Sequence, residues 1–356
     1  MTNLAIARYQ FNFAVNSPLH LNFYSGSLLR GVFGHALRRV SCMTKMKACP
    51  ACPLYRTCPY TTVFEMPPPE QHHLQNFSQI PNPYLIEPPP LGSKTYQAGD
   101  VLSFSMVLIG PAIAQLPLLI FAWQQAFALG VGKTNSTACL INVVLMTATE
   151  SPKVIYDAQI DSPVHAHEAF MLPRLADQHS VTLQFNTPLQ IQKQGKVLAA
   201  EMSAKDFLMA LIRRYYLLYE FYGRDYQAPN FRQLAEHAQT ITSTNDFKWN
   251  QWQRYSNRQQ QAMRIDGVLG SLSLTGQLSD FLPMLQAGQW LHVGHKTTFG
   301  MGQYTLHMHD KRRSVGWISD SAIRQPIRCM TLSLMHPTAL TQTAPLTILP
   351  KQLFRP

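Results

Sequence analysis

Apolar positions along this chain repeat with two different periods, and each period predicts one kind of element. Alternation with a period of two predicts strands at residues 3–15, 101–110, 138–146, 180–191, 267–278 and 303–309. Apolar faces with a helical period predict helices at residues 26–40, 116–130, 203–223 and 279–288. Ser203 with Asp206 is expected to cap the third helix, and Gly223 to end it. Ser279 is expected to cap the fourth.

The two halves of the chain share roughly the same β-α-β-α-β succession of elements. This succession predicts an α+β fold of two tandem ferredoxin-like (RRM-like) domains, an architecture shared by many RNA-binding proteins. We assign residues 1–150 to the N-terminal domain, 151–178 to a linker and 179–310 to the C-terminal domain. Residues 311–356 lack clear periodicity and are expected to be a tail or linker. The prolines of residues 66–90 predict an extended connection, because proline interrupts helices and central strands.

The charge balance narrows the class of partner. The chain has 30 Lys and Arg residues against 19 Asp and Glu, a net charge of +11. Such a surplus favours a polyanionic partner, nucleic acid or an anionic membrane, and a basic surface without a special partner stays open. Prolines and glutamines interrupt the longest apolar stretch, residues 106–132, so we expect no membrane span. The N-terminus lacks a signal-peptide pattern, and we expect a cytoplasmic protein.

Four of the six cysteines lie close together in the sequence. Cys42, Cys49, Cys52 and Cys58 fall within seventeen residues, and the inner two form a CxxC pair. In a reducing compartment this spacing favours a metal site over disulfides, and four thiolates fit a closed tetrahedral zinc site. We therefore expect a four-cysteine metal-binding insertion with structural Zn²⁺ at about residues 41–62 of the first domain. An iron–sulfur cluster and four free thiols both stay open.

A glycine-rich, cationic loop stands at residues 291–306, LHVGHKTTFGMGQYTL. Such a loop could bind a nucleotide, bind an RNA backbone, or form a turn between two elements. It lacks the GK[ST] ending of a phosphate loop and precedes a predicted strand, which disfavours the nucleotide. The stretch LGVGKTNS at 129–136 fails the same motif, because Phe127 stands where its first glycine is needed. Nucleotide hydrolysis is therefore not expected.

Four stretches, taken in their order and spacing, resemble one family. They are SLLRGVFGHALRR (27–39), the Cys-containing loop ending in CPYTTVFE (58–65), RYSNRQ (254–259) and LHVGHKTTFGMGQY (291–304). They resemble the CRISPR-associated endoribonucleases of the RAMP superfamily, which cut precursor CRISPR RNA at its repeats. RAMP proteins carry tandem ferredoxin-like domains, with a glycine-rich loop between the last helix and the last strand. The chain departs from the pattern at His295, where a lysine is expected and Lys296 follows instead.

The resemblance implies metal-independent cleavage of RNA, with no catalytic metal. The 2′-hydroxyl attacks the phosphodiester in line and leaves a 2′,3′-cyclic phosphate and a 5′-hydroxyl, which requires a base, an acid and cations. Family members often carry catalytic histidines on or just after the first helix, which indicates His35 here. Tyr24 is a candidate hydroxyl partner, Arg38 a candidate catalytic cation, and His292 and His295 are reserve histidines. An RNA-binding or structural role of His35 stays open.

The other candidate residues are expected to bind RNA. We expect phosphate and base contacts from the first helix, from the RYSNRQ segment on a helix, and from the glycine-rich loop. These residues are Arg30, Arg39, Arg254, Tyr255, Arg258, His292, Gly294, His295, Lys296, Thr297, Gly300 and Gly302. Salt bridges for the arginines, and a structural turn for single glycines, stay open.

The resemblance also implies partners. The first is CRISPR repeat RNA and the crRNA made from it. Some relatives are fused to a reverse transcriptase and a spacer integrase, so such a partner, or a CRISPR effector complex, is a second expectation. Two other functions stay open: a non-catalytic RAMP subunit that holds guide RNA in an effector complex, and a generic zinc-stabilised RNA-binding protein.

Overall fold

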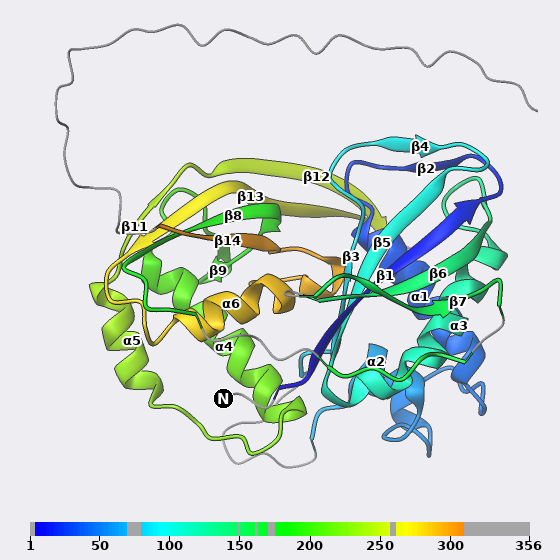
Figure 1. Ribbon diagram of the computed structural model, residues 1–356, viewed down its shortest axis with the longest axis horizontal. Coiled ribbons are helices and arrows are strands. Elements are labelled where there is room, and N and C mark those ends of the chain that lie inside the picture. Colours follow the sequence, from blue (N-terminus) through cyan, green and yellow to red (C-terminus); the bar gives the residue numbers. More distant parts are fainter. Residues whose placement is uncertain are drawn as a thin grey trace, which may run out of the picture. The chain divides into compact units, whose positions relative to one another are not determined.

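Two five-stranded antiparallel sheets organise the protein, one in each half of the chain (Figure 1). The computed structural model describes residues 4–69, 80–147, 150–160, 163–169, 175–256 and 261–309. The first sheet has the strand order β3-β5-β1-β6-β7. Its strands are β1 (Ile6–Val15), β3 (Tyr84–Glu87), β5 (Val101–Ile109), β6 (Ala138–Met146) and β7 (Lys153–Asp157).

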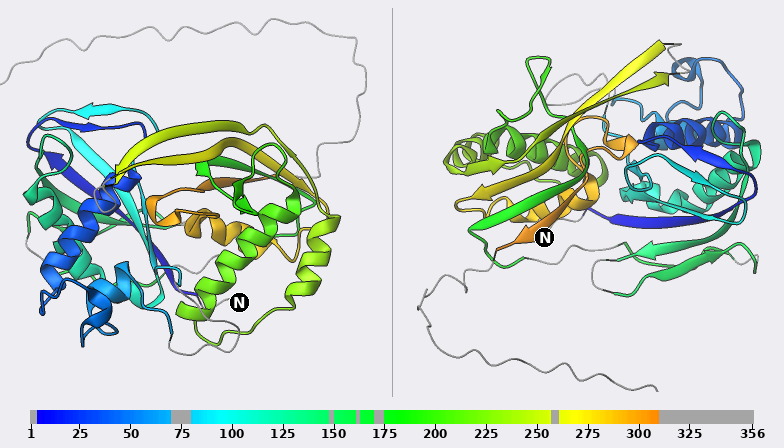
Figure 2. Two further views of the ribbon diagram at one scale, coloured as in Figure 1. Left: turned by 180° about the vertical axis from the view of Figure 1, so that it is seen from behind. Right: turned by 90° about the horizontal axis from the view of Figure 1, so that it is seen from above.

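Helices cover one face of the first sheet and enclose an aromatic core (Figure 2). These helices are α1 (Gly26–Ser41), α2 (Pro59–Phe64) and α3 (Leu116–Leu129). Alternate residues of β1 point into the core, so Phe11 and Phe13 are fully buried and both stack on Phe104. Phe33 of α1 stacks on Trp123 of α3 with ring centroids 4.9 Å apart. The apolar residues that alternate in the sequence of β1 are therefore the ones whose side chains face the helices.

The helix α3 and the 3₁₀ turn before it, η2 (Gly110–Gln115), form a helical stretch that is long and apolar enough to cross a membrane. The comparison with a membrane span rests on the length and composition of the helix alone. In the structure, Leu119, Trp123 and Phe127 of this helix are buried in the first core. Such burial of one face is typical of the core helix of a folded domain.

The second sheet has the strand order β11-β13-β8-β14, and β12 also pairs with β13. Its strands are β8 (Ser180–Leu189), β11 (Thr242–Asn245), β12 (Lys248–Ser256), β13 (Gln261–Thr275) and β14 (Tyr304–Met308). The helices of this half are α4 (Ala204–Tyr222), α5 (Phe231–Thr240) and α6 (Leu282–Leu291). Two short pairs complete the strands: β2 (Leu19–Leu21) with β4 (Lys94–Tyr96), and β9 (Gln192–Lys193) with β10 (Lys196–Val197).

Both five-stranded sheets place their main strands in the same order. In the first sheet β1 lies between β5, which precedes α3, and β6, which follows it; in the second sheet β8 lies between β13, which precedes α6, and β14, which follows it. β3 pairs with the other side of β5, and β11 pairs with the other side of β13. This arrangement agrees with the β-α-β-β-α-β pattern of the ferredoxin-like motif. The predicted α+β class and its mixed helices and antiparallel sheets are confirmed.

Several local predictions are confirmed at the level of single residues. The strand β6 has the predicted bounds, and α3 ends immediately before Gly130. At the start of α4 the Ser203 hydroxyl accepts from the Asp206 N–H at 3.1 Å, and the Asp206 carboxylate accepts from the Ser203 N–H at 3.2 Å. This reciprocal pair is a capping box with aspartate in the glutamate position. The prediction for Ser279 is wrong, because α6 begins at Leu282 without a side-chain cap.

Two segments predicted as connections contain strands of the first sheet. β3 lies within the proline-rich residues 66–90, and it occupies the sheet edge next to β5. An edge strand tolerates the preceding Pro83, since only one side of the strand must hydrogen-bond. β7 lies within residues 151–178 and pairs with β6 at the other edge. Both strands are short, and their hydrophobic patterns are too brief to predict them.

The first three residues of the RYSNRQ segment, which was predicted on a helix, lie in a strand. Arg254 and Tyr255 lie in β12, whose register with β13 runs from Lys248 opposite Leu269 to Ser256 opposite Gln261. Arg258 lies outside the described residues. The four-residue spacing of the arginines favoured a helix, but continuous pairing with β13 decides the backbone. Helix α5 and strand β11 also had no counterpart in the prediction.

Candidate nucleic-acid interface

The glycine-rich loop, residues 292–302, connects α6 to β14 and turns sharply at its glycines. Gly300 has a φ of 89°, and a Cβ there would lie 2.5 Å from the Ile86 carbonyl oxygen. Gly302 has a φ of 74°, and a Cβ there would overlap the Val293 carbonyl oxygen. Only glycine satisfies both the left-handed backbone and the close approach. The turn itself therefore requires these two glycines, which was one of the open alternatives.

Residues at and after the end of β8 support this loop. The Thr187 hydroxyl donates to the Gly300 carbonyl at 2.6 Å. Gln190 accepts twice: its carbonyl accepts from the His295 N–H, and its side-chain oxygen accepts from the Lys296 ammonium, both at 2.8 Å. The loop is thus held in one conformation by hydrogen bonds from a neighbouring strand end.

The side chains of the loop differ in what they offer to a ligand. His295 is exposed, Lys296 is half-buried, and Thr297 is buried. Thr297 was predicted to bind RNA; only 5% of this residue is exposed, and its RNA contact stays a prediction. The pKa of His295 is lowered, first by partial loss of hydration and then by the positive charges of Lys296 and Arg213. Its ring is therefore neutral near pH 7 and can accept a proton.

The outer face of α1 presents a row of exposed positions. Gly31, His35 and Arg39 are all exposed and lie four residues apart, so they follow one another along a single side of the helix. Gly31 leaves open space one turn before His35, since nothing lies within 4 Å of a Cβ placed there. His35 can therefore be approached by a large ligand, as its predicted role requires.

Arg38 does not share this row. Its guanidinium donates to the carbonyls of Met46 and Lys47 at 2.7 and 3.0 Å, and it lies over the Tyr60 ring with 5.8 Å to the centroid. The side chain therefore holds the Cys loop, residues 42–58, against α1. Arg38 thus contacts the Cys loop, and its predicted catalytic role beside His35 stays a prediction.

Tyr24 and Arg30 join α1 to the glycine-rich loop. The Tyr24 hydroxyl donates to the Phe299 carbonyl at 2.5 Å, and burial raises the pKa of Tyr24 well above its usual value. The Arg30 guanidinium lies between two rings, 4.3 Å from the centroid of Phe64 and 5.1 Å from that of Phe299. Tyr24 thus positions the loop from inside, and its role as a hydroxyl partner in catalysis stays a prediction. Helix α1 and the loop form one continuous region.

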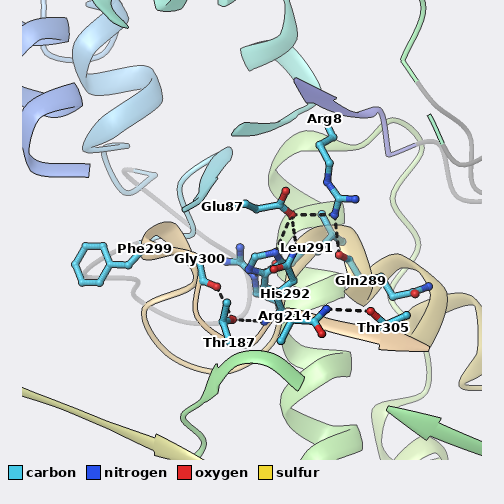
Figure 3. Close-up of polar contacts among 12 residues, drawn as sticks. Arg8, Glu87, Thr187, Arg214, Gln289, Leu291, His292, Phe299, Gly300 and Thr305 are labelled. Atoms are coloured by element: carbon cyan, nitrogen blue, oxygen red, sulfur yellow. Dashed lines mark hydrogen bonds and ion pairs between the residues drawn. The ribbon is translucent and has the colours of Figure 1, made fainter. Parts of the chain in front are cut away.

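Beneath the loop, a buried network connects the two halves of the chain (Figure 3). Glu87, at the end of β3, accepts from the Arg8 guanidinium at 2.8 Å and is 3.0 Å from His292 Nε2. Arg8 also donates to the Gln289 carbonyl at 2.9 Å and lies over the Trp290 ring at 4.1 Å. Arg8 of β1 and Glu87 of the edge strand β3 therefore contact the end of α6, where the loop begins.

The network fixes the protonation of its members. Burial alone would raise the pKa of Glu87, but Arg8 and then His292 outweigh it, so the pKa is lowered and the carboxylate is charged. Burial lowers the pKa of His292 against the opposing effect of Glu87, so the ring is neutral and its Nε2–H donates to the carboxylate. His292 is fully buried. This burial does not support the predictions that His292 contacts RNA or serves as a reserve catalytic histidine, and both stay predictions.

Arg8, Glu87 and Thr187 were not singled out from the sequence. Arg8 lies in an alternating strand, and Thr187 reads as one of many small polar residues. Glu87 carried a usable signal, because it is an isolated acid at the end of the apolar run YLIE, next to prolines. A charged residue in such a run is rarely buried without a partner.

The remaining predicted RNA contacts lie on the second sheet. Arg254 and Tyr255 belong to the β12–β13 hairpin, which Figure 2 shows extending beyond its sheet toward the half that carries α1. The backbone of both residues is extended, so the helical face that the spacing of Arg254 and Arg258 predicted does not begin at Arg254. A two-stranded ribbon of this kind can lie in a groove of a nucleic acid.

The four clustered cysteines line a single pocket in the Cys loop, together with Arg38 and other residues. All four are half-buried, and burial is the main cause that raises the pKa of Cys49. Among the residues that the structure describes, no group of three or more His, Cys, Asp or Glu side chains is already arranged to hold a metal ion. The donor set fits a thiolate metal site, whereas the spacing of the sulfurs does not yet do so.

Comparison with known protein families matches the two halves separately. Residues 4–169 match the family model AF_1859_N, described as an N-terminal domain. Residues 183–304 match the model of the CRISPR-associated endoribonuclease Cas6. The second match ends at the first residue of β14, so it includes the whole glycine-rich loop. No curated protein matches the sequence.

Solved structures of similar fold come from the same group of proteins. The partial Cas6-RT-Cas1–Cas2 complex has a chain that is 13% identical, with a TM-score of 0.51 over 87% of this chain and 47% of that chain. The full Cas6-RT-Cas1–Cas2 complex gives the same values over 29% of its chain. The product complex of a Thermus thermophilus Cas6 is 15% identical, with a TM-score of 0.51 over 85% of this chain and 99% of that one. The chain spans less than half of the fused chains that it matches.

Proposed function

We propose that this chain, a RAMP-type protein with a Cas6 endoribonuclease domain, cleaves CRISPR repeat RNA to produce crRNA. The match of residues 183–304 to the Cas6 family carries this proposal. The repeated strand order supports a reading of the two halves as tandem ferredoxin-like domains. The net charge of +11 suits an RNA partner.

The proposed reaction is transesterification without a catalytic metal. The 2′-hydroxyl loses its proton and its oxygen attacks the adjacent phosphorus, while the 5′-oxygen of the next nucleotide leaves and takes up a proton. The products are a 2′,3′-cyclic phosphate and a 5′-hydroxyl. A base, an acid and cations near the phosphorane are the groups that this reaction needs from the protein.

The exposed row on α1 and the glycine-rich loop supply such groups. His35 is exposed with open space beside it, and we assign it one of the two proton transfers. His295 is the second proton-transfer candidate, because its lowered pKa keeps the ring neutral near pH 7. We assign phosphate contacts to Arg39, which is exposed on α1, and to Lys296, which is half-buried in the loop.

Backbone contacts complete the proposed RNA site. Glycines allow a phosphate to approach the main chain of the loop closely. Arg30, Gly294, Gly300 and Gly302 shape this region, and Arg254 and Tyr255 of the hairpin extend it. Base reading is expected from splayed, unpaired nucleotides, since the major groove of A-form RNA is too deep for side chains.

A reverse transcriptase and integrase are the proposed protein partners. The fused chains of similar fold combine Cas6 with RT and Cas1 in one complex with Cas2. This chain covers only part of such a chain, so the partner would be attached beyond it or recruited separately. Co-purification with an RT–Cas1 protein from the same genome would test this partner. We place the protein in the cytoplasm, where precursor RNA is made.

The test is cleavage of end-labelled repeat RNA from the source genome in EDTA, with zinc content measured in the same protein sample. Wild type is expected to cut once. His35→Ala is expected to slow cleavage by about 10²–10⁴-fold, the usual size of a general acid or base contribution. A 2′-deoxy nucleotide before the cut should abolish cleavage while the RNA still binds.

Matched variants separate the remaining outcomes. His20 is another exposed histidine, and His20→Ala should cut like wild type. Arg39→Ala should weaken binding and reduce the salt slope by about one, as for a lost phosphate contact. If His295→Ala stops cleavage and His35→Ala does not, the reaction stands and the role passes to His295. If wild type binds repeat RNA and never cuts it, the chain is a non-catalytic guide-holding subunit and the proposal fails.

A further inference from the structure

The Cys loop lacks the burial that holds other parts of the chain. Every residue from 43 to 57 is exposed or half-buried, and Met43 is 78% exposed. The contacts that join the loop to α1 are mainly those of Arg38 with the Met46 and Lys47 carbonyls. Polar and exposed residues cannot compensate the entropy of ordering such a segment. A further source of order is therefore required.

Within this exposed loop, the four cysteines occupy the ends of the regular elements. Cys42 follows the last turn of α1, and Cys58 precedes the first turn of α2. Cys49 begins the 3₁₀ turn η1 (Cys49–Ala51), and the Cys52 N–H closes it by donating to the Cys49 carbonyl at 2.9 Å. Both cysteines of the CxxC pair line the same pocket.

Hydrogen-bonded turns then return the chain to α2. The Tyr55 N–H donates to the Cys52 carbonyl at 2.9 Å, and the Cys58 N–H donates to the Leu54 carbonyl at 2.8 Å. All four cysteines consequently line one pocket, although they come from three separate stretches of backbone. Chance placement of four thiols would not direct all of them to one pocket.

The charges around the pocket suit an anionic centre. Arg38 of α1 lines the pocket, and the loop carries Lys45, Lys47 and Arg56 and no acid, while the carboxylate of Glu65 after α2 is close enough to act on Cys49. A divalent ion with four thiolates carries a net charge of about −2. Cations beside such a centre lower its energy, whereas a cluster of neutral thiols would gain nothing from them.

We propose that Cys42, Cys49, Cys52 and Cys58 bind one Zn²⁺ as a tetrahedral tetrathiolate that fastens the end of α1 to the start of α2. On binding, four S–H groups become thiolates and release four protons, and no oxidation or reduction takes place. The sulfurs are not yet spaced to hold an ion, so binding must draw the exposed loop together. Soft thiolate donors select zinc over magnesium or calcium, which prefer oxygen ligands.

The proposed zinc site takes no part in RNA cleavage. It would act by holding the end of α1 in place. Cys42 follows the C-terminal end of α1, where Arg39 also lies. Arg39 is one helical turn beyond His35. Fastening this end would fix the direction of the exposed row. The zinc proposal stands or falls independently of the nuclease proposal, because metal content is measured without RNA.

The first test is the metal content of the full chain purified without chelators, by inductively coupled plasma mass spectrometry. About one zinc per chain is expected, as for one structural site. Replacement by Co²⁺ should give visible d–d bands and near-ultraviolet thiolate-to-cobalt bands of a tetrahedral tetrathiolate. Iron with acid-labile sulfide, or no metal before and after incubation with Zn²⁺, would overturn the proposal.

Variants assign the ligands. The double variant Cys49→Ser/Cys52→Ser should lose the bound zinc, while Cys139→Ser should keep it, since Cys139 is exposed on β6 and outside the pocket. If the double variant does not fold, wild type answers the question: a thiol reagent that modifies the cysteines should release one zinc in step with the loss of four thiols. Release with fewer than three thiols modified, or zinc loss in Cys139→Ser, would contradict the assignment of four cysteine ligands.

Discussion

The glycine-rich loop and the Cys loop are both irregular segments beside helix ends, but different forces hold them. The glycine-rich loop is held by Thr187 and Gln190 from one side and by Tyr24 from the other, above the buried Glu87 network. The Cys loop has no buried residue between 43 and 57. The first is ordered by tertiary packing, and we propose that a bound ion orders the second. Removing one support should therefore leave the other loop intact.

The largest expected effect is on the support of the glycine-rich loop. Glu87→Ala leaves Arg8 and His292 without their shared acceptor in a buried site. We expect a loss of about 3–5 kcal/mol in the free energy of unfolding, the usual cost of breaking a buried ion pair from one side. Urea unfolding of the purified variant measures it.

The matched control is Glu150→Ala. Glu150 pairs with Lys153 at 2.7 Å, but both side chains are more than half exposed. An exposed pair contributes about 0–1 kcal/mol. Equal losses in the two variants would mean that the Glu87 network does not carry the loop.

The next effect concerns the turn itself. Gly302→Ala must place a Cβ against the Val293 carbonyl at a φ of 74°, and we expect a loss of about 1–3 kcal/mol. Gly31→Ala on the exposed face of α1 meets no atom within 4 Å and should gain about 0.5–1 kcal/mol through helix propensity. Opposite signs are expected in thermal unfolding, and a loss in both variants would refute the contrast.

A local effect should separate the two loops more sharply. Chelation of the bound zinc is expected to speed amide hydrogen exchange throughout residues 42–58 and to leave residues 292–302 unchanged. The reason is that the contacts of the glycine-rich loop do not involve the cysteines. Hydrogen exchange with mass spectrometry measures both segments in one sample. Equal acceleration in both would show that the ion orders the whole interface.

The smallest effect is a pH dependence of stability from the buried network. The pKa of His292 is lowered from 6.5, so the native state binds fewer protons than the unfolded state. The stabilisation is complete above about pH 6.5 and is lost as the pH falls below it toward the lowered value. Glu87, lowered from 4.5, adds a second loss below about pH 4.5.

The measurement compares urea midpoints at neutral and mildly acidic pH. His292→Gln should flatten the slope between these pH values, and the exposed variant His35→Gln should keep the slope of wild type. Because acid also releases zinc from thiolates, the comparison is made on protein with its metal removed. An unchanged slope in His292→Gln would remove His292 from the explanation.

The sequence allowed good predictions where the determining contacts are local. The bounds of β6, the capping box at Ser203 and the end of α3 at Gly130 depend on neighbours a few residues away. The exposed position of His35 follows from the apolar face of the helix that carries it. These features need no knowledge of the rest of the fold.

The rest of the site depends on contacts between distant residues. Glu87 meets Arg8 across 79 positions and His292 across 205, so no local pattern could reveal that His292 is buried. The burial of Tyr24 and Thr297 was missed for the same reason: both are polar residues near a polar loop, yet the fold buries both. Arg254 was predicted on a helix from its four-residue spacing to Arg258. The backbone pairing of β12 with β13 places it on a strand instead.

The contact between Arg8 and the Gln289 carbonyl has a consequence for the growing chain. These residues are 281 positions apart, so the contact between the first sheet and α6 cannot form until almost the whole described chain has been translated. At about 5–20 residues per second, this delay lasts roughly 15–60 s. The N-terminal half can fold on the ribosome during that time, while the loop that would grip RNA is still unmade. The proposed RNA site is thus complete only after residues 292–302 have been made.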